Sequence, residues 1–199
     1  MEGVLIGCCP ITWPRETEQK QILAEVAEAG FDGAMASPMA GLTAREVSDM
    51  FSSFGLKPAP GYLGANFWDP EKKEEILERA KMLSEFMAEV GCSELYVADN
   101  GFRTESPRGI VRWELAAHTT PEDSLSEDQY KWAAETLNEV GELTLESDVR
   151  ICFHNHVGSF IETRKEIDRL FSLVDRDLVF QGPDIGHLAW AGGDVVDFT

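Results

Sequence analysis

Two histidines at the end of a short apolar run are the most chemically informative feature of the sequence. The run Val149–His154 is typical of a buried strand, and His156 follows two residues later. Because side chains alternate along a strand, His154 and His156 share one face, whereas Asn155 lies on the other. Imidazole binds metal ions and transfers protons near neutral pH. The pattern therefore favours a functional site over a pair of hydrogen-bonded structural histidines.

A second group of candidate residues follows the next apolar run along the chain. Asp184 comes after Leu178–Gln181, among small residues that let the chain turn, and His187 lies three residues further on. A carboxylate at that place suits a divalent cation, and His187 can reach the same space. Asp is equally common as a turn or helix N-cap residue, so the spacing alone leaves both interpretations open.

Three further side chains are each open to two interpretations. Glu162, just before a capping Thr163, either reaches a metal or substrate from its loop or favours the positive end of the helix that follows. Trp13 and Trp190 either form walls of a sugar-sized pocket or belong to the apolar core.

These residues lie within a repeated alternation of short apolar runs and amphipathic helices. The predicted strands are Val4–Cys9, Gly33–Ala36, Leu56–Tyr62, Glu94–Ala98, Val149–His154 and Leu178–Gln181. The helices between them have readable starts, at Gln19, Thr43, Asp69, Ser126 and Thr163, the second, fourth and fifth with a capping box. Alternating strands and helices predict a parallel sheet with helices outside it.

The phosphate-binding fingerprints of open doubly wound sheets, GxGxxG and GxxxxGK[ST], do not occur in the sequence. Large polar residues instead follow several strands, as at the mouth of a barrel. We therefore predict one domain over residues 1–199, an α/β (β/α)8 TIM barrel truncated after about six βα units. A sixth helix would begin near residues 194–199, a complete barrel needs ~250 residues, and the first and sixth strands would be left as open edges.

The longest connection, residues 99–125, follows a strand and could cover the barrel mouth or remain a solvated surface loop. Its arginines, Arg103, Arg108 and Arg112, could bind a phosphate or only solvent.

Charge and cysteine content exclude several classes of protein. Lys and Arg number 17 against 36 Asp and Glu, giving a formal charge of -19, which argues against binding to nucleic acids or to anionic membranes. No apolar run approaches the ~18 residues of a membrane span. No basic segment precedes the first apolar run, and the four cysteines include no CxxC, so we expect reduced thiols in a cytoplasmic protein.

Taken together, these motifs resemble a known family. The quoted segments are Gly7-x-x-Pro10-Ile-Thr-Trp13, His154-Asn-His156-Val-Gly158 with Glu162-Thr163, Asp184-x-Gly-His187-Leu and Ala-Gly-Gly-Asp194. They are similar to the sugar phosphate isomerase/epimerase superfamily of xylose isomerase-like TIM barrels, and within it to the inosose (2-keto-myo-inositol) dehydratase group. The similarity spans nearly the whole chain, although its specific motifs lie mainly in residues 151–194.

The resemblance implies a barrel that binds one divalent ion, Mn, Co or Mg. Asp184 matches an aspartate ligand of the family, and His154 stands where many members carry a glutamate. The remaining ligands of the family, a histidine and a glutamate from the seventh and eighth strands, would lie beyond Thr199. Met35 also departs from the family, whose members commonly carry a glutamate there.

The resemblance and the residues suggest one chemistry, proton abstraction next to a carbonyl, leading to isomerisation, epimerisation or dehydration. We assign the metal to His154 and Asp184, the catalytic steps to His156, Glu162 and His187, and substrate binding to Trp13, Asn155 and Trp190. The expected substrate is a small sugar, keto-polyol or inosose. Dimers and tetramers are common in the family, so a homo-oligomer is possible, but the sequence does not fix the oligomeric state.

Two rival functions follow from the same pattern. Apurinic endonucleases share this barrel, but they need a basic DNA-binding face that a charge of -19 does not provide. A truncated or degenerate barrel could instead act without catalysis, as a carbohydrate-binding or assembly module.

Overall fold

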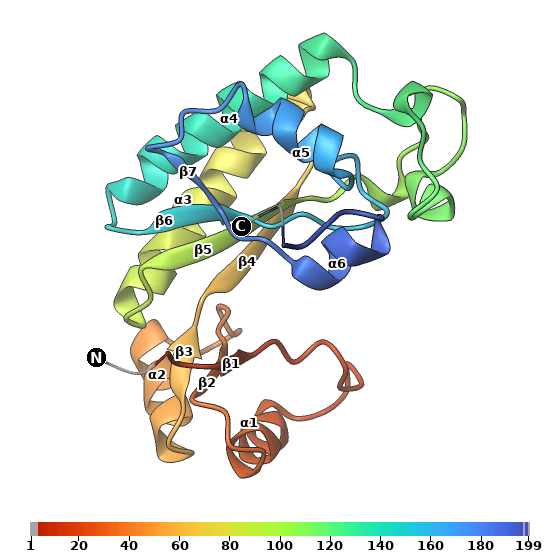
Figure 1. Cartoon of the computed structure of the whole chain (residues 1–199). Coiled ribbons are helices and arrows are strands. Elements are labelled where there is room, and N and C mark those ends of the chain that lie inside the picture. Colours follow the sequence, from red (N-terminus) through yellow and green to blue (C-terminus); the bar gives the residue numbers. More distant parts are fainter. Residues whose placement is uncertain (1–3, 197, 199) are drawn as a thin grey trace.

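Seven short strands, all parallel to their neighbours, organise the computed structural model, which describes residues 4–196 and 198 (Figure 1). The strands are β1 (Gly7–Cys8), β2 (Gly33–Met35), β3 (Lys57–Ala59), β4 (Gly61–Ala65), β5 (Glu94–Asp99), β6 (Arg150–Phe153) and β7 (Val179–Gln181). Hydrogen bonding joins them in the orders β1-β2-β3 and β4-β5-β6-β7. This is the parallel α/β arrangement that the alternating pattern predicts.

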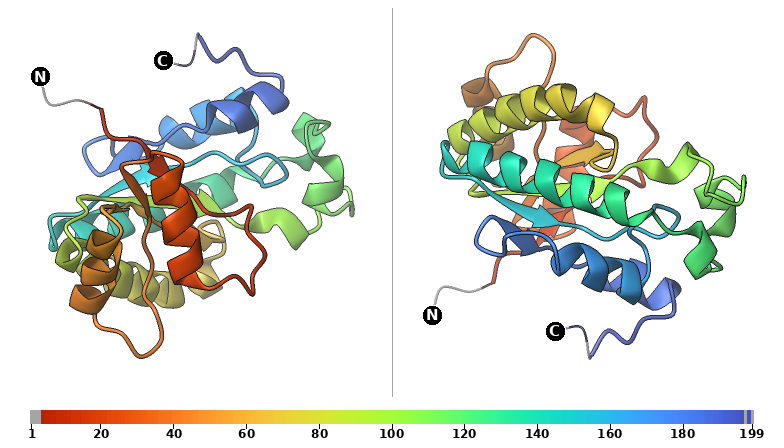
Figure 2. Two further views of the ribbon diagram at one scale, coloured as in Figure 1. Left: turned by 90° about the horizontal axis from the view of Figure 1, so that it is seen from below. Right: turned by 90° about the horizontal axis from the view of Figure 1, so that it is seen from above.

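Helices follow the strands and cover their outer side. They are α1 (Gln19–Glu28), α2 (Ala44–Ser53), α3 (Lys73–Glu89), α4 (Glu127–Leu145), α5 (Arg164–Phe171) and α6 (Ile185–Trp190), with 3-10 turns η1 (Pro70–Lys72), η2 (Gly101–Arg103), η3 (Arg112–Leu115) and η4 (Pro121–Asp123). The predicted capping boxes at Thr43, Ser126 and Thr163 are all formed. Figure 2 shows α3 and α4 side by side, and α4 also contacts α5.

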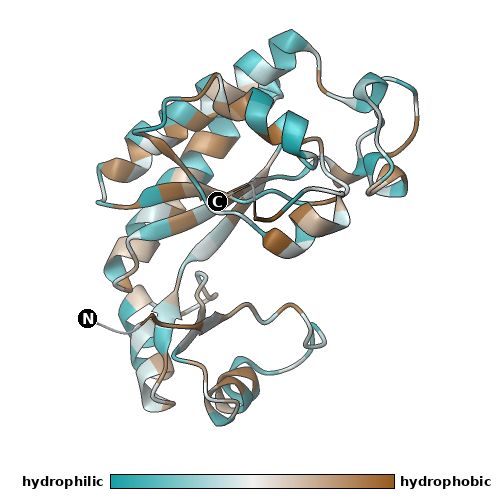
Figure 3. Cartoon of the chain, in the orientation of Figure 1, coloured by the Kyte–Doolittle hydropathy of each residue, from teal (hydrophilic) through white to brown (hydrophobic). Residues whose placement is uncertain are grey.

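The main core lies between these helices and the outward-facing side chains of the strands. Leu63, Leu95, Val97 and Ile151 from the strands meet Met87 of α3, Leu137 of α4 and Leu170 of α5, all fully buried. Hydrophobic and hydrophilic segments alternate along α3 and α4 in Figure 3, as amphipathic helices require. No helix within the described residues combines the length and apolar character needed to cross a bilayer.

The predicted third strand, residues 56–62, is divided in two at Pro60. Residues Lys57–Ala59 pair with β2, whereas Gly61–Ala65 pair with β5. Proline has no N–H to donate, so the ladder breaks at that position and the chain changes partner. A Cβ at Gly61 would lie 2.9 Å from the Ala36 carbonyl oxygen, so glycine allows the backbone to approach closely after the break.

The structure also differs from two predictions about the first strand and the last helix. The first strand is shorter than residues 4–9, because only Gly7–Cys8 pairs with β2. The sixth helix begins at Ile185 rather than near residue 194, because Asp184 caps it directly after β7. Among the described strands, β1 pairs only with β2 and β7 only with β6, so the expected open edges are present.

Candidate active site

A cavity of about 1070 Å³ lies along strands β1 to β5 and the segments that follow β6 and β7, and four of the eight candidate residues line it. His154, His156, Asp184 and His187 line it, together with Cys9 and Met35 near β1 and β2. The Cys9 Sγ lies 3.8 Å from the Met35 Sδ, so sulfur rather than carboxylate forms this part of the wall. Residues that are far apart in the sequence thus meet at one cavity, as the parallel topology predicts.

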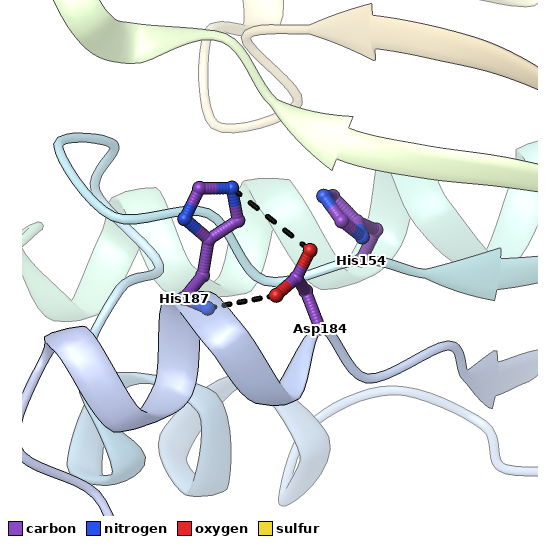
Figure 4. Close-up of side chains that lie close together, drawn as sticks. All are labelled: His154, Asp184 and His187. Carbon is purple, nitrogen blue, oxygen red and sulfur yellow. Dashed lines mark hydrogen bonds and ion pairs between the residues drawn. The ribbon is translucent and has the colours of Figure 1, made fainter. Parts of the chain in front are cut away.

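Three side chains in this cavity are placed to hold a metal ion. One ligand atom each from His154, Asp184 and His187 lies within 4.8 Å of the others (Figure 4). His154 directly follows β6, and its backbone N–H donates to the Val97 carbonyl of β5 (2.8 Å). Asp184 precedes α6, where its Oδ1 accepts from the His187 N–H (2.7 Å) and its Oδ2 lies 4.0 Å from His187 Nε2. Asp184 is therefore both a helix N-cap and a member of the cluster.

Asn155 fixes the position of Asp184 through the backbone. Its Nδ2 donates to the Asp184 carbonyl oxygen (3.1 Å), and its Oδ1 accepts from the Asp184 N–H (3.0 Å). The Asn155 side chain is buried and is not among those that line the cavity. The structure therefore places Asn155 behind the cluster, where it orients a candidate ligand, rather than at the substrate face expected from the sequence.

The three imidazoles form one group, and burial favours the neutral form of two of them, His154 and His187. The ring centroids of His156 and His187 are 3.7 Å apart, and those of His154 lie 5.9 and 5.8 Å from them. Burial lowers the pKa of His154 to about 4 and also lowers the pKa of His187, in both cases against the opposing charge of Asp184. A neutral imidazole is the form that binds a metal ion.

His156 has a defined protonation pattern. Its Nδ1 lies 2.8 Å from the Val157 carbonyl oxygen. Because a carbonyl oxygen only accepts, this hydrogen bond places the proton of the neutral ring on Nδ1 and leaves Nε2 free to accept another. Phe102 packs edge-to-face against the same ring, with centroids 4.7 Å apart.

Glu162 lies outside the cavity, in a buried network. Its carboxylate accepts from the backbone N–H groups of Gly158 (2.6 Å) and Ala117 (2.8 Å) and lies 3.8 Å from Arg112 Nη2. Burial raises its pKa, against the hydrogen bonds and the charge of Arg112. Neither sequence interpretation of Glu162 anticipated this contact with the long connection.

Arg112 holds the long connection, residues 99–125, in place through buried hydrogen bonds. Its side chain is completely buried, and it donates from Nε to the Ser159 carbonyl (2.8 Å) and from Nη1 to the Asp123 carbonyl (3.2 Å). Arg108 in turn donates to both carboxylate oxygens of Asp123 (2.7 and 2.6 Å). Both arginines therefore pair within the protein, and residues 99–125 are anchored on the turn that carries His156.

The aromatic candidates are distributed differently from the expectation. Trp13 packs against the core and donates to Glu25 Oε2 (2.7 Å), as its structural interpretation requires. Trp190 is 56% exposed and stacks on His187, with centroids 6.4 Å apart. The rings that flank His154 are Tyr62 and Tyr96, at 5.8 and 6.3 Å, which the sequence reasoning missed. Tyr62 and Tyr96 are register partners on the adjacent strands β4 and β5. In the sequence, the available signal was one tyrosine in each of two successive apolar runs.

Parallel βα units with a cluster of metal-ligand side chains at the carboxyl ends of neighbouring strands define a barrel-type α/β protein with a candidate metal centre. Residues 23–199 match the family model described as xylose isomerase-like TIM barrel, and the chain belongs to that family. This confirms the predicted fold class.

Individual relatives agree with this membership. The chain is 27% identical over 207 residues to an inosose dehydratase of Geobacillus kaustophilus (strain HTA426), covering 96% of this chain and 63% of the relative. Its fold is similar to a sugar phosphate isomerase/epimerase from Parabacteroides distasonis ATCC 8503 (TM-score 0.70, 16% identity, 100% of this chain and 71% of the other). It is also similar to the IOLI protein with a bound zinc atom (TM-score 0.70, 16% identity, 97% and 67%). The chain spans 63% to 66% of the length of the first curated relatives it matches.

Proposed function

We propose that this chain provides the substrate cavity and part of the metal centre of a divalent-metal-dependent sugar or polyol isomerase, epimerase or dehydratase, with an inosose dehydratase-like reaction as the preferred assignment. The observation that carries the proposal is the convergence of His154, Asp184 and His187 on one point at the cavity wall. The names of the curated relatives favour inososes over other sugars.

The donor set fits a divalent transition metal. Two imidazole nitrogens and one carboxylate oxygen suit Mn, Co or Zn better than Mg, which prefers oxygen ligands throughout. The lowered pKa of His154 keeps its nitrogen available, and Asn155 holds the backbone of Asp184 in place. When bound, such an ion would act as a Lewis acid on the carbonyl of the substrate.

His156 is the residue that we assign to proton transfer. Its Nδ1 is engaged by the Val157 carbonyl, so its Nε2 accepts the proton from the carbon next to the substrate carbonyl and can return it. His187 packs against the same ring and shares the cavity. We assign Glu162 to positioning of the 158–162 turn through Gly158, rather than to a step of its own.

The cavity suits a small, neutral substrate. Its wall carries the histidine cluster, the hydroxyls of Tyr62 and Tyr96, the sulfur atoms of Cys9 and Met35, and charged groups of both signs at Asp32, Lys57 and Glu94. This distribution supports a sugar, keto-polyol or inosose that presents its carbonyl end to the cluster. The four cysteines are free thiols, which supports the expectation of a reducing cytoplasm, and the charge of -19 supports the expectation that nucleic acid is not a partner.

Turnover of inosose and of a panel of ketoses, with Mn²⁺ or Co²⁺ present, tests the assignment. We expect water loss or epimer formation in the wild type, and a loss of at least ~100-fold in His156→Ala and in Asp184→Asn. Lys81→Met, an exposed position on α3, is the control that retains activity. Unchanged turnover in Asp184→Asn would overturn the assignment.

The unpaired edges of β1 and β7 favour one alternative, a carbohydrate-binding or assembly module without catalysis. That function would show binding of the same inosose with no product under every metal condition, and a homo-oligomer in sedimentation analysis.

A further inference from the structure

Phe102 is the aromatic side chain through which the long connection, residues 99–125, reaches the main cavity. It is half-buried, yet it is neither part of the described apolar core nor packed against it. Its ring instead meets two side chains edge-to-face, His156 at a centroid distance of 4.7 Å and Trp113 at 6.1 Å. An aromatic ring that the core does not use thus packs on the imidazole to which we assign proton transfer.

The orientation of the His156 ring depends on contacts of this kind. The torsion that turns an imidazole about its Cβ–Cγ bond has a broad, roughly two-fold energy profile, so it does not select one of the two flipped orientations. Among the described residues, the His156 side chain has one hydrogen-bond partner, the Val157 carbonyl oxygen, 2.8 Å from Nδ1. A half-turn of the ring would leave a carbon atom facing that carbonyl and would move Nε2 to the place of Cε1. Ring contacts must therefore supply the remaining restraint.

Two neighbouring rings supply that restraint. His187 lies 3.7 Å from His156 between centroids, with an angle of 38° between the ring planes, whereas Phe102 meets the same ring at 75°. The Phe102 distance is close to the lower limit for an aromatic pair, so the two rings are in direct contact. His187 belongs to the candidate metal cluster, and Phe102 is the contact that comes from outside it. Two contacts at different inclinations hold a planar ring in one orientation.

The backbone that carries Phe102 is fixed from two sides. The Arg112 N–H donates to the Thr104 carbonyl oxygen (3.0 Å), and the Arg112 side chain is completely buried. A Cβ at Gly101 would lie 2.5 Å from Phe160 Cδ2, so glycine allows η2 to lie directly on that ring. The connection therefore presents Phe102 to His156 from a well-packed segment.

We propose that Phe102 is a positioning residue for His156. It holds the imidazole in the orientation in which Nδ1 meets the Val157 carbonyl and Nε2 is free for proton transfer. The inference rests on the proposed function for the role of His156, and it deepens that function by naming the residue outside the metal cluster that prepares the proton acceptor. Its first test is the state of the His156 ring, which is measured without turnover.

The test records the ¹⁵N NMR signals of the His156 ring in the 199-residue chain, without added metal and at about pH 9, where imidazole is neutral. A neutral imidazole carries its proton on one nitrogen, so the signals report the ratio of the two tautomers. We expect the Nδ1–H form to dominate in the wild type. Phe102→Leu should lower the ratio of the Nδ1–H to the Nε2–H form by roughly three- to tenfold, because the ring then turns away from the Val157 carbonyl for part of the time.

Two variants separate positioning from general packing. Phe102→Tyr keeps the aromatic ring and should retain the tautomer ratio of the wild type. Phe180→Leu is the matched control, because Phe180 is also half-buried and outside the described core, but its ring lies beside Arg150 (5.6 Å from Cζ to the centroid) rather than a histidine. This variant should leave the ratio unchanged.

Kinetics with Mn²⁺ or Co²⁺ provide the second measurement. Phe102→Leu should lower kcat by roughly three- to tenfold and leave KM and metal content within about twofold, because it acts on the proton acceptor and not on binding. A wild type without turnover would contradict the proposed function, whereas the tautomer comparison would still decide the role of Phe102.

Several results would overturn the positioning role. An unchanged tautomer ratio in Phe102→Leu would show that Val157 and His187 hold the ring without Phe102. A raised KM with an unchanged kcat would make Phe102 a substrate contact instead. An equal change of the ratio in Phe180→Leu, or a Phe102→Leu chain that does not fold, would show an effect of general packing.

Discussion

Asn155 and Asp184 are joined by two hydrogen bonds, in which both amide atoms of Asn155 pair with the backbone of Asp184. The pair links the end of β6 to the residue that caps α6, and so it sets the separation between His154 and the Asp184 carboxylate. A side chain that orients a ligand in this way acts on metal affinity without contacting the metal.

Replacing Asn155 by aspartate should weaken metal binding. A carboxylate can accept from the Asp184 N–H, but it cannot donate to the Asp184 carbonyl and would repel it. We expect the affinity for Mn²⁺ or Co²⁺, measured by calorimetry, to fall by ~10- to 100-fold. Asn138→Asp, whose Oδ1 also accepts from a backbone N–H, is the control. An affinity equal to that of the wild type in Asn155→Asp would remove the positioning role.

Gly158 allows the turn after His156 to pack against the long connection. Its φ is +82°, and a Cβ there would lie 2.6 Å from Trp113 Cε3. Gly30 has a similar φ of +84°, but nothing lies within 4 Å of its Cβ position. We expect Gly158→Ala to lower the free energy of unfolding by ~2–4 kcal/mol, and Gly30→Ala by only ~1 kcal/mol from backbone strain. Equal losses in denaturant unfolding would show that the Trp113 contact yields without cost.

Glu162 provides a test between positioning and catalysis. Glutamine retains one acceptor for the Gly158 and Ala117 N–H groups, and it loses the other together with the charge near Arg112. We expect Glu162→Gln to reduce the free energy of unfolding by ~1–3 kcal/mol while metal affinity stays within twofold. Glu135→Gln, exposed on α4, serves as the reference for stability. A fully stable Glu162→Gln protein that bound metal normally but had lost turnover would support the original catalytic assignment instead.

Asp99 should make stability depend on pH in an unusual direction. It is buried, and it accepts from Phe160 N–H (2.6 Å) and Trp68 Nε1 (2.9 Å). Burial raises its pKa to about 6, and the hydrogen bonds and Arg112 only partly oppose this. The folded chain therefore takes up this proton near pH 6 and the unfolded chain near pH 4, so its contribution to stability grows as pH falls between those values.

Comparison with Asp99→Asn isolates that contribution from other carboxylates, such as Asp123, whose pKa is lowered by Arg108 and whose effect has the opposite sign. Urea unfolding at several pH values should show the wild type gaining stability relative to the variant as the pH falls from 7 to 4. A difference that is constant across this range would mean that Asp99 titrates alike in both states.

Much of the fold could be predicted from the sequence because its signals are local. The capping boxes at Thr43, Ser126 and Thr163 mark helix starts within a few residues, and all three are formed. The meeting of His154 with Asp184 and His187 follows from parallel topology, which places successive strand ends at one edge. The division at Pro60 could also have been predicted, because proline cannot donate to a ladder. The continuous apolar run instead favoured a single strand over residues 56–62.

The roles of Asn155, Glu162 and Trp13 could not be predicted, because they depend on partners distant in sequence. Asn155 pairs with a backbone 29 residues away, and Glu162 accepts from an N–H 45 residues away. Trp13 meets Glu25 from the next helix. Strand alternation gives the face on which a side chain lies, but it does not reveal whether a loop from elsewhere already occupies that face.

The central claim, that His154, Asp184 and His187 form a metal centre, is tested most directly by metal content. The 199-residue chain and its Asp184→Asn variant would be dialysed against Mn²⁺ or Co²⁺, desalted and measured by elemental analysis, with Asp194 left intact in both. We predict about one ion per chain in the wild type and a large loss in the variant, because the carboxylate is the only anionic member of the cluster. Absence of metal from the wild type, or equal metal in both proteins, would contradict the account.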